Sequence, residues 1–286
     1  MRILLFFTLV STCFSNSLLA QDKPAYQIFD GSGKKTTYTA MLDSISNQKE
    51  VLLFGEMHDN PIVHWLEFEI TQDLAKVKKL VLGAEMVEAD NQNQLNAYLD
   101  GRINLKQLDS TSRLWMNHKT DYQPLIDFAK ETHLKFIATN IPRRYASLVY
   151  KEGFEVLDSL SPREKEWIAP LPIIYDPSLP RYQEILKMMG EHGSSKLVMA
   201  QAIKDATMAY FIDLNLKKDQ LFIHYNGSFH SDFHEGIVWY LKQLKPKLKA
   251  ITISSVSQKE LNILEPAYLN QADFIIVIDE NMTKTY

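Results

Sequence analysis

The sequence predicts an α/β fold: a mostly parallel sheet with helices on both faces and a helical insertion in the middle of the chain. The first observation is that apolar runs of four to six residues alternate with longer segments of helical periodicity. This alternation is typical of strands joined by helical crossovers. The second is that the short runs are apolar at consecutive positions, as expected for strands that are covered on both faces.

Several of these runs are predicted to be strands. They are Val51 to Phe54, Leu80 to Ala84, Phe136 to Thr139, Leu221 to Tyr225, Ala250 to Ser254 and Phe274 to Ile278. The stretch around Lys35 is not counted as a strand because it is polar.

Helices are predicted between and after these strands, by periodicity and by start signals such as Pro61 in a first turn. They cover Pro61 to about Val77, Asp121 to Thr132, Pro142 to Tyr150, Arg181 to Met189, Ser195 to Leu216 and Glu235 to Leu244. Residues from about 152 to 194 contain clustered prolines and aromatic residues without a strand run, which indicates a helical insertion or lid.

Composition indicates an ordinary globular chain. Of the 286 residues, 45% are hydrophobic and 23% are charged, which is enough for a substantial core in one domain. The net charge is −4, with 31 basic and 35 acidic residues mixed along the chain. Because no basic stripe is present to neutralise phosphates, nucleic acid is excluded as the expected partner.

The first twenty residues have the composition of a secretory signal peptide. Arg2 is the only charge before Asp22, and an apolar run from Ile3 to Val10 is followed by small and polar residues. Cleavage after Ala20 would leave residues 21–286 as a single exported domain without cysteine, periplasmic or associated with the outer membrane. The alternative is a lipoprotein, anchored to a membrane through a lipidated Cys13.

Two copies of a Gly-x-x-His pattern each follow a predicted strand. They are Gly55-Glu56-Met57-His58 and Gly227-Ser228-Phe229-His230. Neighbouring parallel strands would bring their carboxyl ends within roughly 5 to 10 Å, at the sheet edge where ligands of α/β proteins bind. The two histidines are therefore expected to face one pocket.

A further carboxylate, Glu85, follows another of the predicted strands. Together with Glu56, His58 and His230 it could supply the mixed nitrogen and oxygen ligands that Zn, Mn or Fe accept. In such a site one carboxylate could instead be the general base towards a metal-bound water. The alternative for each residue alone is a helix-capping or hydrogen-bonded loop role.

Basic and aromatic residues could line the same pocket. Arg143 and Arg144 open a predicted helix, where the macrodipole disfavours cations by roughly 0.3 to 1 kcal/mol. This placement indicates either an anionic ligand or ion pairs to carboxylates such as Glu85 and Glu56. Phenolate is an axial ligand of haem iron, and Tyr122 and Tyr145 are the first candidates.

Among the remaining histidines, His64 in the first turns of the Pro61 helix could line the pocket. His118, His133 and His192 are expected at the surface.

The chain resembles the ChaN-like haem-binding family, grouped with the Tiki, TraB and erythromycin-esterase-like proteins. The matching segments are Gly55-Glu56-Met57-His58-Asp59-Asn60 with His64, Gly83-Ala84-Glu85-Met86, Trp115 with Tyr122-Gln123-Pro124, Ala138-Thr139-Asn140-Ile141-Pro142-Arg143, Gln201-Ala202-Ile203-Lys204-Asp205-Ala206-Thr207-Met208-Ala209 and Gly227-Ser228-Phe229-His230. They occur in the family's order over roughly residues 45 to 280.

The resemblance implies an exported or lipid-anchored protein that binds haem in iron acquisition, with a homodimer as one implied assembly. The expected haem contacts are His64, Tyr122, Arg143, Arg144 and Tyr145. For the wider superfamily it implies a metal-dependent hydrolase of peptide or ester bonds. Glu56, His58, Glu85 and His230 match that active-site pattern.

Overall fold

The computed structural model describes residues 23–47, 49–190 and 193–286. The predicted signal segment 1–20, with Cys13 and Ala20, lies outside these ranges, as does His192. Within the ranges described, no helix combines the length and the apolar character needed to cross a membrane.

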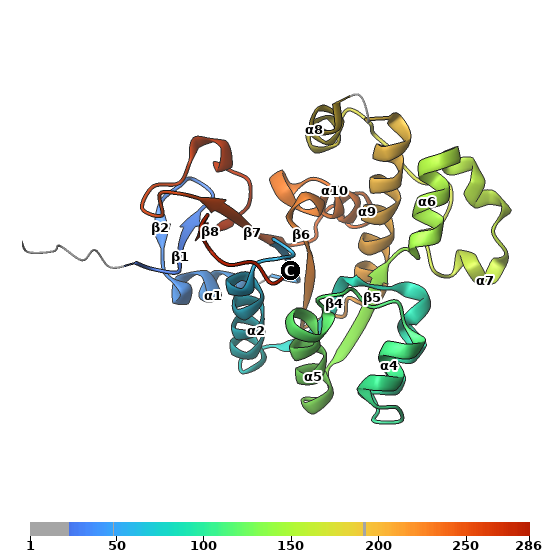
Figure 1. Cartoon of the computed structure of the whole chain (residues 1–286), viewed down its shortest axis with the longest axis horizontal. Helices are drawn as coiled ribbons and strands as arrows, with labels where there is room; N and C mark the ends of the chain where they lie inside the picture. Colours follow the sequence, from blue (N-terminus) through green and yellow to red (C-terminus); the bar gives the residue numbers. More distant parts are fainter. Residues whose placement is uncertain (1–22, 48, 191–192) are drawn as a thin grey trace, which may run out of the picture.

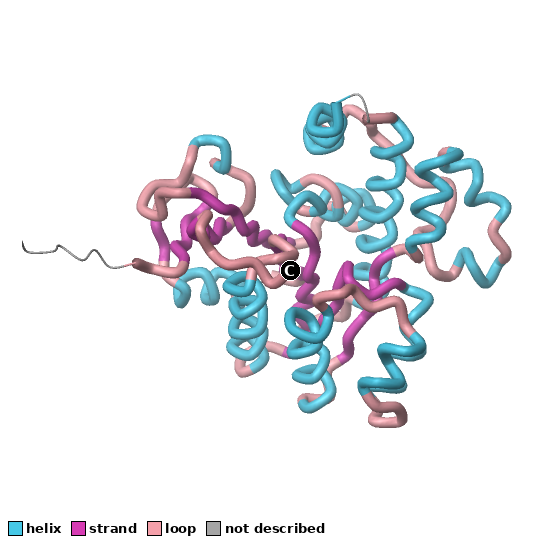
Figure 2. Tube along the Cα trace, in the orientation of Figure 1, coloured by secondary structure: helices cyan, strands magenta, loops and turns pink. Residues whose placement is uncertain are grey.

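An eight-stranded sheet runs through the molecule in the order β2-β1-β8-β7-β3-β6-β4-β5 (Figures 1 and 2). The strands are β1 (Tyr26–Asp30), β2 (Lys35–Thr36), β3 (Val51–Glu56), β4 (Lys79–Glu88), β5 (Lys135–Asn140), β6 (Gln220–Gly227), β7 (Ala250–Gln258) and β8 (Phe274–Asp279). From β8 to β5 all neighbours pair in parallel, whereas β1 pairs antiparallel with β2 and β8. The predicted mostly parallel α/β fold is confirmed.

The first two strands were not predicted, and leaving out the stretch around Lys35 was wrong. Strand β2 contains only Lys35 and Thr36 and lies at the edge of the sheet. An edge strand is held by backbone hydrogen bonds on one side and tolerates exposed polar side chains. Such a strand therefore lacks the apolar run from which buried strands are predicted.

Helices cover both faces of the sheet. Leu52 and Phe54 of β3 pack with residues of α2 (Pro61–Ala75) and α5 (Gln123–Glu131) on one face. Val51 and Leu53 of the same strand pack with α9 (Ser195–Asn215) and α10 (Ile237–Leu244) on the other. Side chains of a strand alternate between faces, so β3 is buried throughout.

The other helices lie at the ends of the strands or extend the two layers. They are α1 (Tyr38–Ser46), α3 (Gln92–Leu99), α4 (Leu105–Thr111), α6 (Arg143–Glu152), α7 (Pro162–Lys165) and α8 (Pro180–Met189). Helix α2 begins where expected: the Asn60 side chain accepts hydrogen bonds from the backbone N–H groups of Ile62 and Val63, with Pro61 in the first turn.

Between α6 and α9 the described residues form helices and turns and no strand. This part contains a short 3₁₀ helix, Phe154–Ser159, then α7 and α8. Tyr182 of α8 packs on Val198 and Ala202 of α9. Helix α8 is thereby held above the carboxyl edge of the sheet (Figure 1).

Candidate functional site

Strand pairing brings the two Gly-x-x-His segments to one edge of the sheet. Strands β3 and β6 are parallel neighbours, with Gly55 opposite Asn226 and Glu56 opposite Gly227. Strand β4 pairs with the other side of β6. Strand β4 is longer than predicted and contains Glu85 within it. The carboxyl ends of these strands therefore present Glu56, His58, Glu85 and His230 together.

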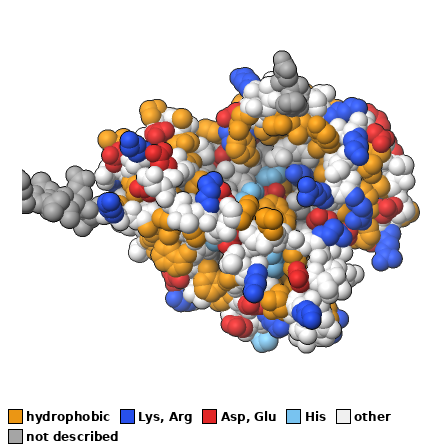
Figure 3. Space-filling model, in the orientation of Figure 1, with side chains coloured by type: hydrophobic (Ala, Val, Ile, Leu, Met, Phe, Trp, Pro, Cys, Tyr) orange, Lys and Arg blue, Asp and Glu red, His pale blue; other side chains and the backbone are white. Residues whose placement is uncertain are grey.

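A cavity of about 650 Å³ opens above this edge. It is lined by Glu56, Met57, His58, Glu85, Glu88, Trp115, Asn140, Ile141, Arg143, Ile185, Met188, Met189, Gln201, Lys204, Gly227, Ser228, Phe229 and His230. Figure 3 shows the hollow, with histidine atoms in its floor and hydrophobic and basic side chains around it. Its volume is in the range of small-molecule and cofactor sites, about 300 to 1,000 Å³.

Glu56 and His58 form a hydrogen-bonded pair in the floor of the cavity. His58 Nδ1 donates to Glu56 Oε1 at 2.6 Å, and the Tyr122 hydroxyl donates to the same oxygen at 2.6 Å. Burial alone would raise the pKa of Glu56, but the hydrogen bond from His58 and the field of His64 lower it. Burial would lower the pKa of His58, and Glu56 and Glu85 raise it instead.

The ring of His58 is packed between Gly227 and Trp115. A β-carbon on Gly227 would lie 2.7 Å from His58 Nε2, so only glycine leaves room for the ring. The Trp115 ring meets that of His58 edge to face, with 4.8 Å between centroids. In the neutral imidazole, Nδ1 carries the proton donated to Glu56 and Nε2 keeps a lone pair. The His58 side chain is 32% exposed.

His230 is held between two carboxylates and is nearly closed to solvent. Nε2 lies 3.2 Å from Glu85 Oε1, and Nδ1 donates to Asp205 Oδ1. Tyr182 donates to the other Asp205 oxygen at 2.8 Å. Burial would lower the pKa of His230, but Glu85 and Asp205 raise it to about 10. Burial would raise the pKa of Glu85, but His230 holds it well below its usual range.

The structure brings the four predicted metal ligands together as two carboxylate–histidine pairs and not as one ligand shell. Both nitrogens of His230 and Nδ1 of His58 are engaged by carboxylates. Glu85 Oε2 accepts the Gly227 backbone N–H at 2.8 Å. In the described residues, the group whose donor atoms do converge within 4.8 Å is Glu56, His64 and Glu67. The donor atoms of the predicted set do not converge on one point in this structure, and a metal ion bound by that set stays a prediction.

The two arginines have different positions. Arg143 lines the cavity. Arg144 forms an ion pair of 2.6 Å with Asp90 and stacks on Tyr145, 4.4 Å from the ring centroid. Arg144 is therefore held in a structural ion pair with Asp90, and not with Glu85 or Glu56. Among described residues, neither Arg143 nor Lys204, the other basic lining residue, forms an ion pair.

Neither candidate tyrosine lines the cavity. Tyr122 lies beneath its floor, and its hydroxyl is used by Glu56. Tyr145 is buried among α6, α7 and α9, and its hydroxyl donates to Glu164 at 2.9 Å. His64 also lies below the floor, 6% exposed. As haem contacts, these three remain predictions that their positions in this conformation do not favour.

His118 was expected at the surface, and that was wrong. It is 4% exposed, and its Nε2 lies 2.9 Å from Gln123 Oε1. Its hydrogen-bonding partner is five residues away, a spacing that does not match the three- or four-residue repeat of a helix face. Periodicity therefore gave no indication that His118 is buried. His133 is exposed as expected.

Asp205 and Glu67 were not singled out from the sequence. Asp205 lies between Ala, Ile and Met residues of α9, and it is completely buried. A charged residue on such a face signals a buried partner. Glu67 is three residues after His64, so the two side chains share a helix face. The apolar neighbours of Asp205 and the spacing of Glu67 from His64 could therefore have identified both residues.

Comparison with known proteins identifies a matching family and similar folds. The family model described as "Haem-binding uptake, Tiki superfamily, ChaN" matches residues 41–241. The solved structure of Campylobacter jejuni ChaN with cofacial haem is similar, with a TM-score of 0.66 and 17% identity, over 88% of this chain and 96% of that one. The resemblance proposed from sequence is confirmed.

Other relatives share the fold or a segment. A Bacillus cereus protein of solved structure has a TM-score of 0.51 and 12% identity, over 84% of this chain and 90% of that one. A succinoglycan biosynthesis protein has a TM-score of 0.53 and 10% identity, over 86% and 92%. The chloroplast protein RETICULATA-RELATED 5 of Arabidopsis thaliana is 28% identical over 148 residues, 49% of this chain. The match spans only 19% of that relative's length.

Gly227→Ala is expected to displace the His58 ring and leave the fold intact. The new methyl carbon would lie 2.7 Å from Nε2 and 3.0 Å from Cε1. Moving the ring would lengthen its hydrogen bond to Glu56, so the pKa of His58 should fall towards the ordinary value. NMR titration of the imidazole measures this, with Ser228→Ala as control. An unchanged His58 pKa would contradict the prediction.

The stability of the protein should depend on pH through His230. An unfolded histidine has a pKa of about 6.5, whereas His230 in the folded chain has a pKa of about 10. The contribution of His230 to the free energy of unfolding is complete below about pH 6.5. It is lost as the pH rises towards 10, by up to about 1.4 kcal/mol per pH unit. Urea unfolding between these pH values should give a clearly flatter profile for His230→Gln. Equal slopes in both proteins would show that the prediction is wrong.

Proposed function

The chain belongs to the ChaN haem-binding uptake family of the Tiki superfamily, and from this premise we propose that it binds haem in the cavity at the carboxyl ends of the strands. The observation that carries the proposal is the composition of the cavity lining. Its lining combines apolar side chains, among them Trp115, Ile185 and Phe229, with histidines and basic residues. A porphyrin ring packs against the apolar side chains, its iron takes an axial ligand such as histidine, and its propionates pair with cations.

His58 is the side chain best placed to hold the iron. Its Nε2 has a lone pair, its Nδ1–H is held by Glu56, and about a third of the side chain is exposed, 32%. A carboxylate on the opposite nitrogen orients a ligating histidine and increases its basicity. His230 is less suitable because both of its nitrogens contact carboxylates and it is only 6% exposed.

Arg143 and Lys204 are placed to meet the propionates. Both line the cavity, and neither forms an ion pair with a described residue. An arginine side chain can donate two parallel hydrogen bonds to one carboxylate, which favours Arg143 as the orienting contact. Arg143→Gln should therefore weaken haem binding while leaving the iron ligand in place.

We also propose that the protein is exported and takes part in haem or iron uptake or handling. The proposal rests on the signal-like composition of residues 1–20 and on the family. Location in the periplasm or at the outer membrane, lipid attachment through Cys13 and assembly as a homodimer belong to the same proposal.

The haem proposal predicts a saturable spectral change. Haemin added to the purified chain should shift the Soret band and saturate at one or fewer haems per chain. His58→Ala should weaken binding at least tenfold and change the spectrum, and Arg143→Gln should weaken binding without changing the band position. His133→Ala, an exposed histidine, is the matched control.

Two outcomes would count against this. If no saturable change occurs, the protein does not bind haem. If His58→Ala keeps the native spectrum while Tyr122→Phe or Tyr145→Phe loses it, a tyrosinate holds the iron and the assignment to His58 is wrong.

A second candidate function is hydrolysis of peptide or ester bonds. It is favoured by the two carboxylate–histidine pairs that face one cavity. His58, oriented by Glu56, would take a proton from water, and His230 would donate one to the leaving group, since the pKa of His230 is about 10. The four residues do not form one metal shell, so no step is assigned to a metal.

The hydrolase proposal predicts activity against a panel of peptides and esters that depends on both histidines. Loss of a positioned acid or base slows a reaction by roughly 100-fold or more. His58→Ala and His230→Gln should each show this loss in kcat, and His133→Ala should not. Undiminished activity in both site variants would refute the proposal.

A further inference from the structure

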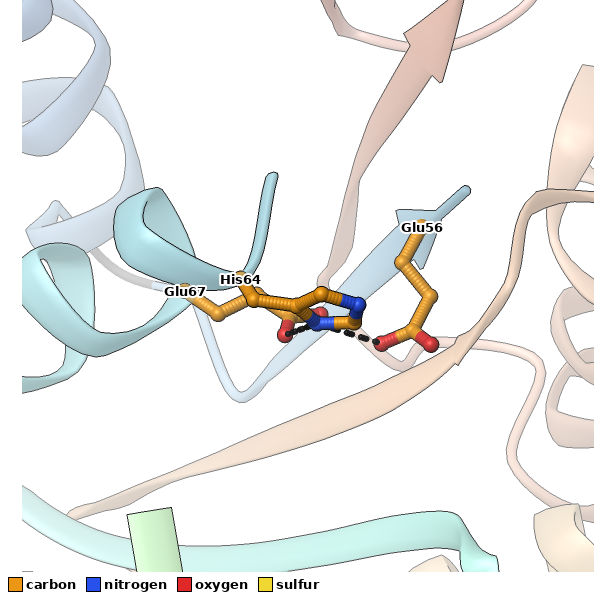
Figure 4. Close-up of side chains that lie close together, drawn as sticks. All are labelled: Glu56, His64 and Glu67. Atoms are coloured by element: carbon orange, nitrogen blue, oxygen red, sulfur yellow. Dashed lines mark hydrogen bonds and ion pairs between the residues drawn. The ribbon is translucent and has the colours of Figure 1, made fainter. Parts of the chain in front are cut away.

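A second cluster of ligand-type side chains lies beneath the floor of the cavity. Glu56 comes from β3, and His64 and Glu67 come from α2, with one donor atom of each within 4.8 Å of the others. Their exposed fractions are 2%, 6% and 0%. Figure 4 shows the His64 ring between the two carboxylates. Strand and helix thus converge on a small volume that is almost closed to solvent.

Both carboxylates point an unsatisfied oxygen into the protein interior. Glu56 Oε2 and Glu67 Oε1 are buried and have no hydrogen-bond partner. In the ranges 23–47, 49–190 and 193–286, neither glutamate forms an ion pair with a lysine or arginine. A buried carboxylate without a partner is costly. Burial and the neighbouring Glu56 raise the pKa of Glu67, so two such carboxylates side by side require a positive charge, either a proton or a bound cation.

His64 turns its Nδ1 towards this space, and this nitrogen can ligate a metal ion once it carries no proton. Nε2 lies 3.0 Å from the backbone carbonyl of His58, which can only accept, so the proton must be on Nε2. Asp121 Oδ2 lies 3.5 Å from the same nitrogen. Nδ1 faces the glutamates, 3.1 Å from Glu67 Oε2 and 4.0 Å from Glu56 Oε2. Metal-ligating histidines typically donate their other N–H to a carbonyl or carboxylate.

Glu56 is oriented in the same manner. Its Oε1 accepts hydrogen bonds from the Tyr122 hydroxyl and from His58 Nδ1, each at 2.6 Å. These bonds hold the carboxylate so that Oε2 is directed towards His64. Each of these two ligands therefore has an outer partner that fixes it.

We propose that Glu56, His64 and Glu67 bind a divalent transition-metal ion, separate from the haem cavity. Ligands about 2.0 to 2.2 Å from one ion are at most about 4.4 Å apart, and the separations of 3.1 and 4.0 Å from Nδ1 comply. One imidazole with two carboxylates suits Zn²⁺, Mn²⁺ or Fe²⁺. The ion would enter through the cavity, because Glu56 also lines it.

The test measures binding of metal alone to the full chain. Chelator-treated protein is dialysed against Zn²⁺, Mn²⁺ or Co²⁺, and its metal content is measured after gel filtration. The wild type should retain one ion per chain and unfold at a higher temperature with metal. Co²⁺ should give ligand-field absorption bands, which report an inner-sphere site.

Glu67→Gln keeps the size of the side chain and should lower metal affinity at least tenfold. His230→Ala is the matched control, since it removes a histidine of the strand-end pairs but no donor of the proposed site, and it should bind normally. Thermal unfolding of the metal-free variants shows that each is folded. His64→Gln is the second variant should Glu67→Gln fail to fold.

Three results would overturn the proposal. The first is that the wild type binds none of the three ions. The second is that Glu67→Gln and His64→Gln, both folded, bind metal as the wild type does. The third is that His230→Ala loses the ion, which would assign it to the strand-end pairs. If no ion binds and Glu67→Gln unfolds at a higher temperature than the wild type, a shared proton holds the cluster together.

Discussion

The register of β3 against β6 is the constraint on which the site depends. Glu56 lies opposite Gly227 in this pairing, so the residues that follow both strands emerge at one point. A slip of one residue would turn every side chain of a strand to the other face. Leu52 and Phe54 on one face and Val51 and Leu53 on the other are all completely buried. The hydrophobic core therefore determines the register, and the register determines where the histidines meet.

The site that results is rich in buried charge. Glu56, Glu85 and Asp205 are at most 4% exposed, and the positive charges nearest to them are histidines. Lysine and arginine would neutralise the acids permanently, whereas imidazole does so only when it holds a proton. His58 and His230 therefore have raised pKa values, and each is oriented by the carboxylates that raise its pKa. Burial is tolerated because the charges are paired within hydrogen-bonding distance.

The sheet and the strand-end residues could be predicted from the sequence, because both follow from local patterns. Apolar runs mark buried strands, and polar residues directly after them mark the ligand edge. The short edge strand at Lys35 had no such pattern. The identity of long-range partners was also beyond prediction: the burial of Asp205 could have been expected, but its pairing with His230 depends on how α9 packs at the strand ends. Arg144 pairs with Asp90, a carboxylate that no spacing rule connects to it.

The ligand shell was the part of the site that the sequence could not settle. Four residues at one edge were expected to converge on one ion. In the folded chain, Gly227 and the β4 register keep Glu85 with His230, and Glu56 with His58. The strand-end residues all lie along one edge of the sheet. A helix packed beneath that edge can add ligand atoms from another direction. His64 and Glu67 do this from α2, which is why a convergent set includes residues from outside the sheet edge.

Glu56 joins the cavity to the cluster beneath it. One of its oxygens holds His58 and Tyr122, and the other faces His64. A cation at the second oxygen would draw electron density from the carboxylate and weaken its hold on the His58 proton. The basicity of His58 Nε2 towards a ligand in the cavity would then fall. Binding of a cation to the cluster would thus change ligand binding in the cavity through the single carboxylate of Glu56, without any movement of the backbone.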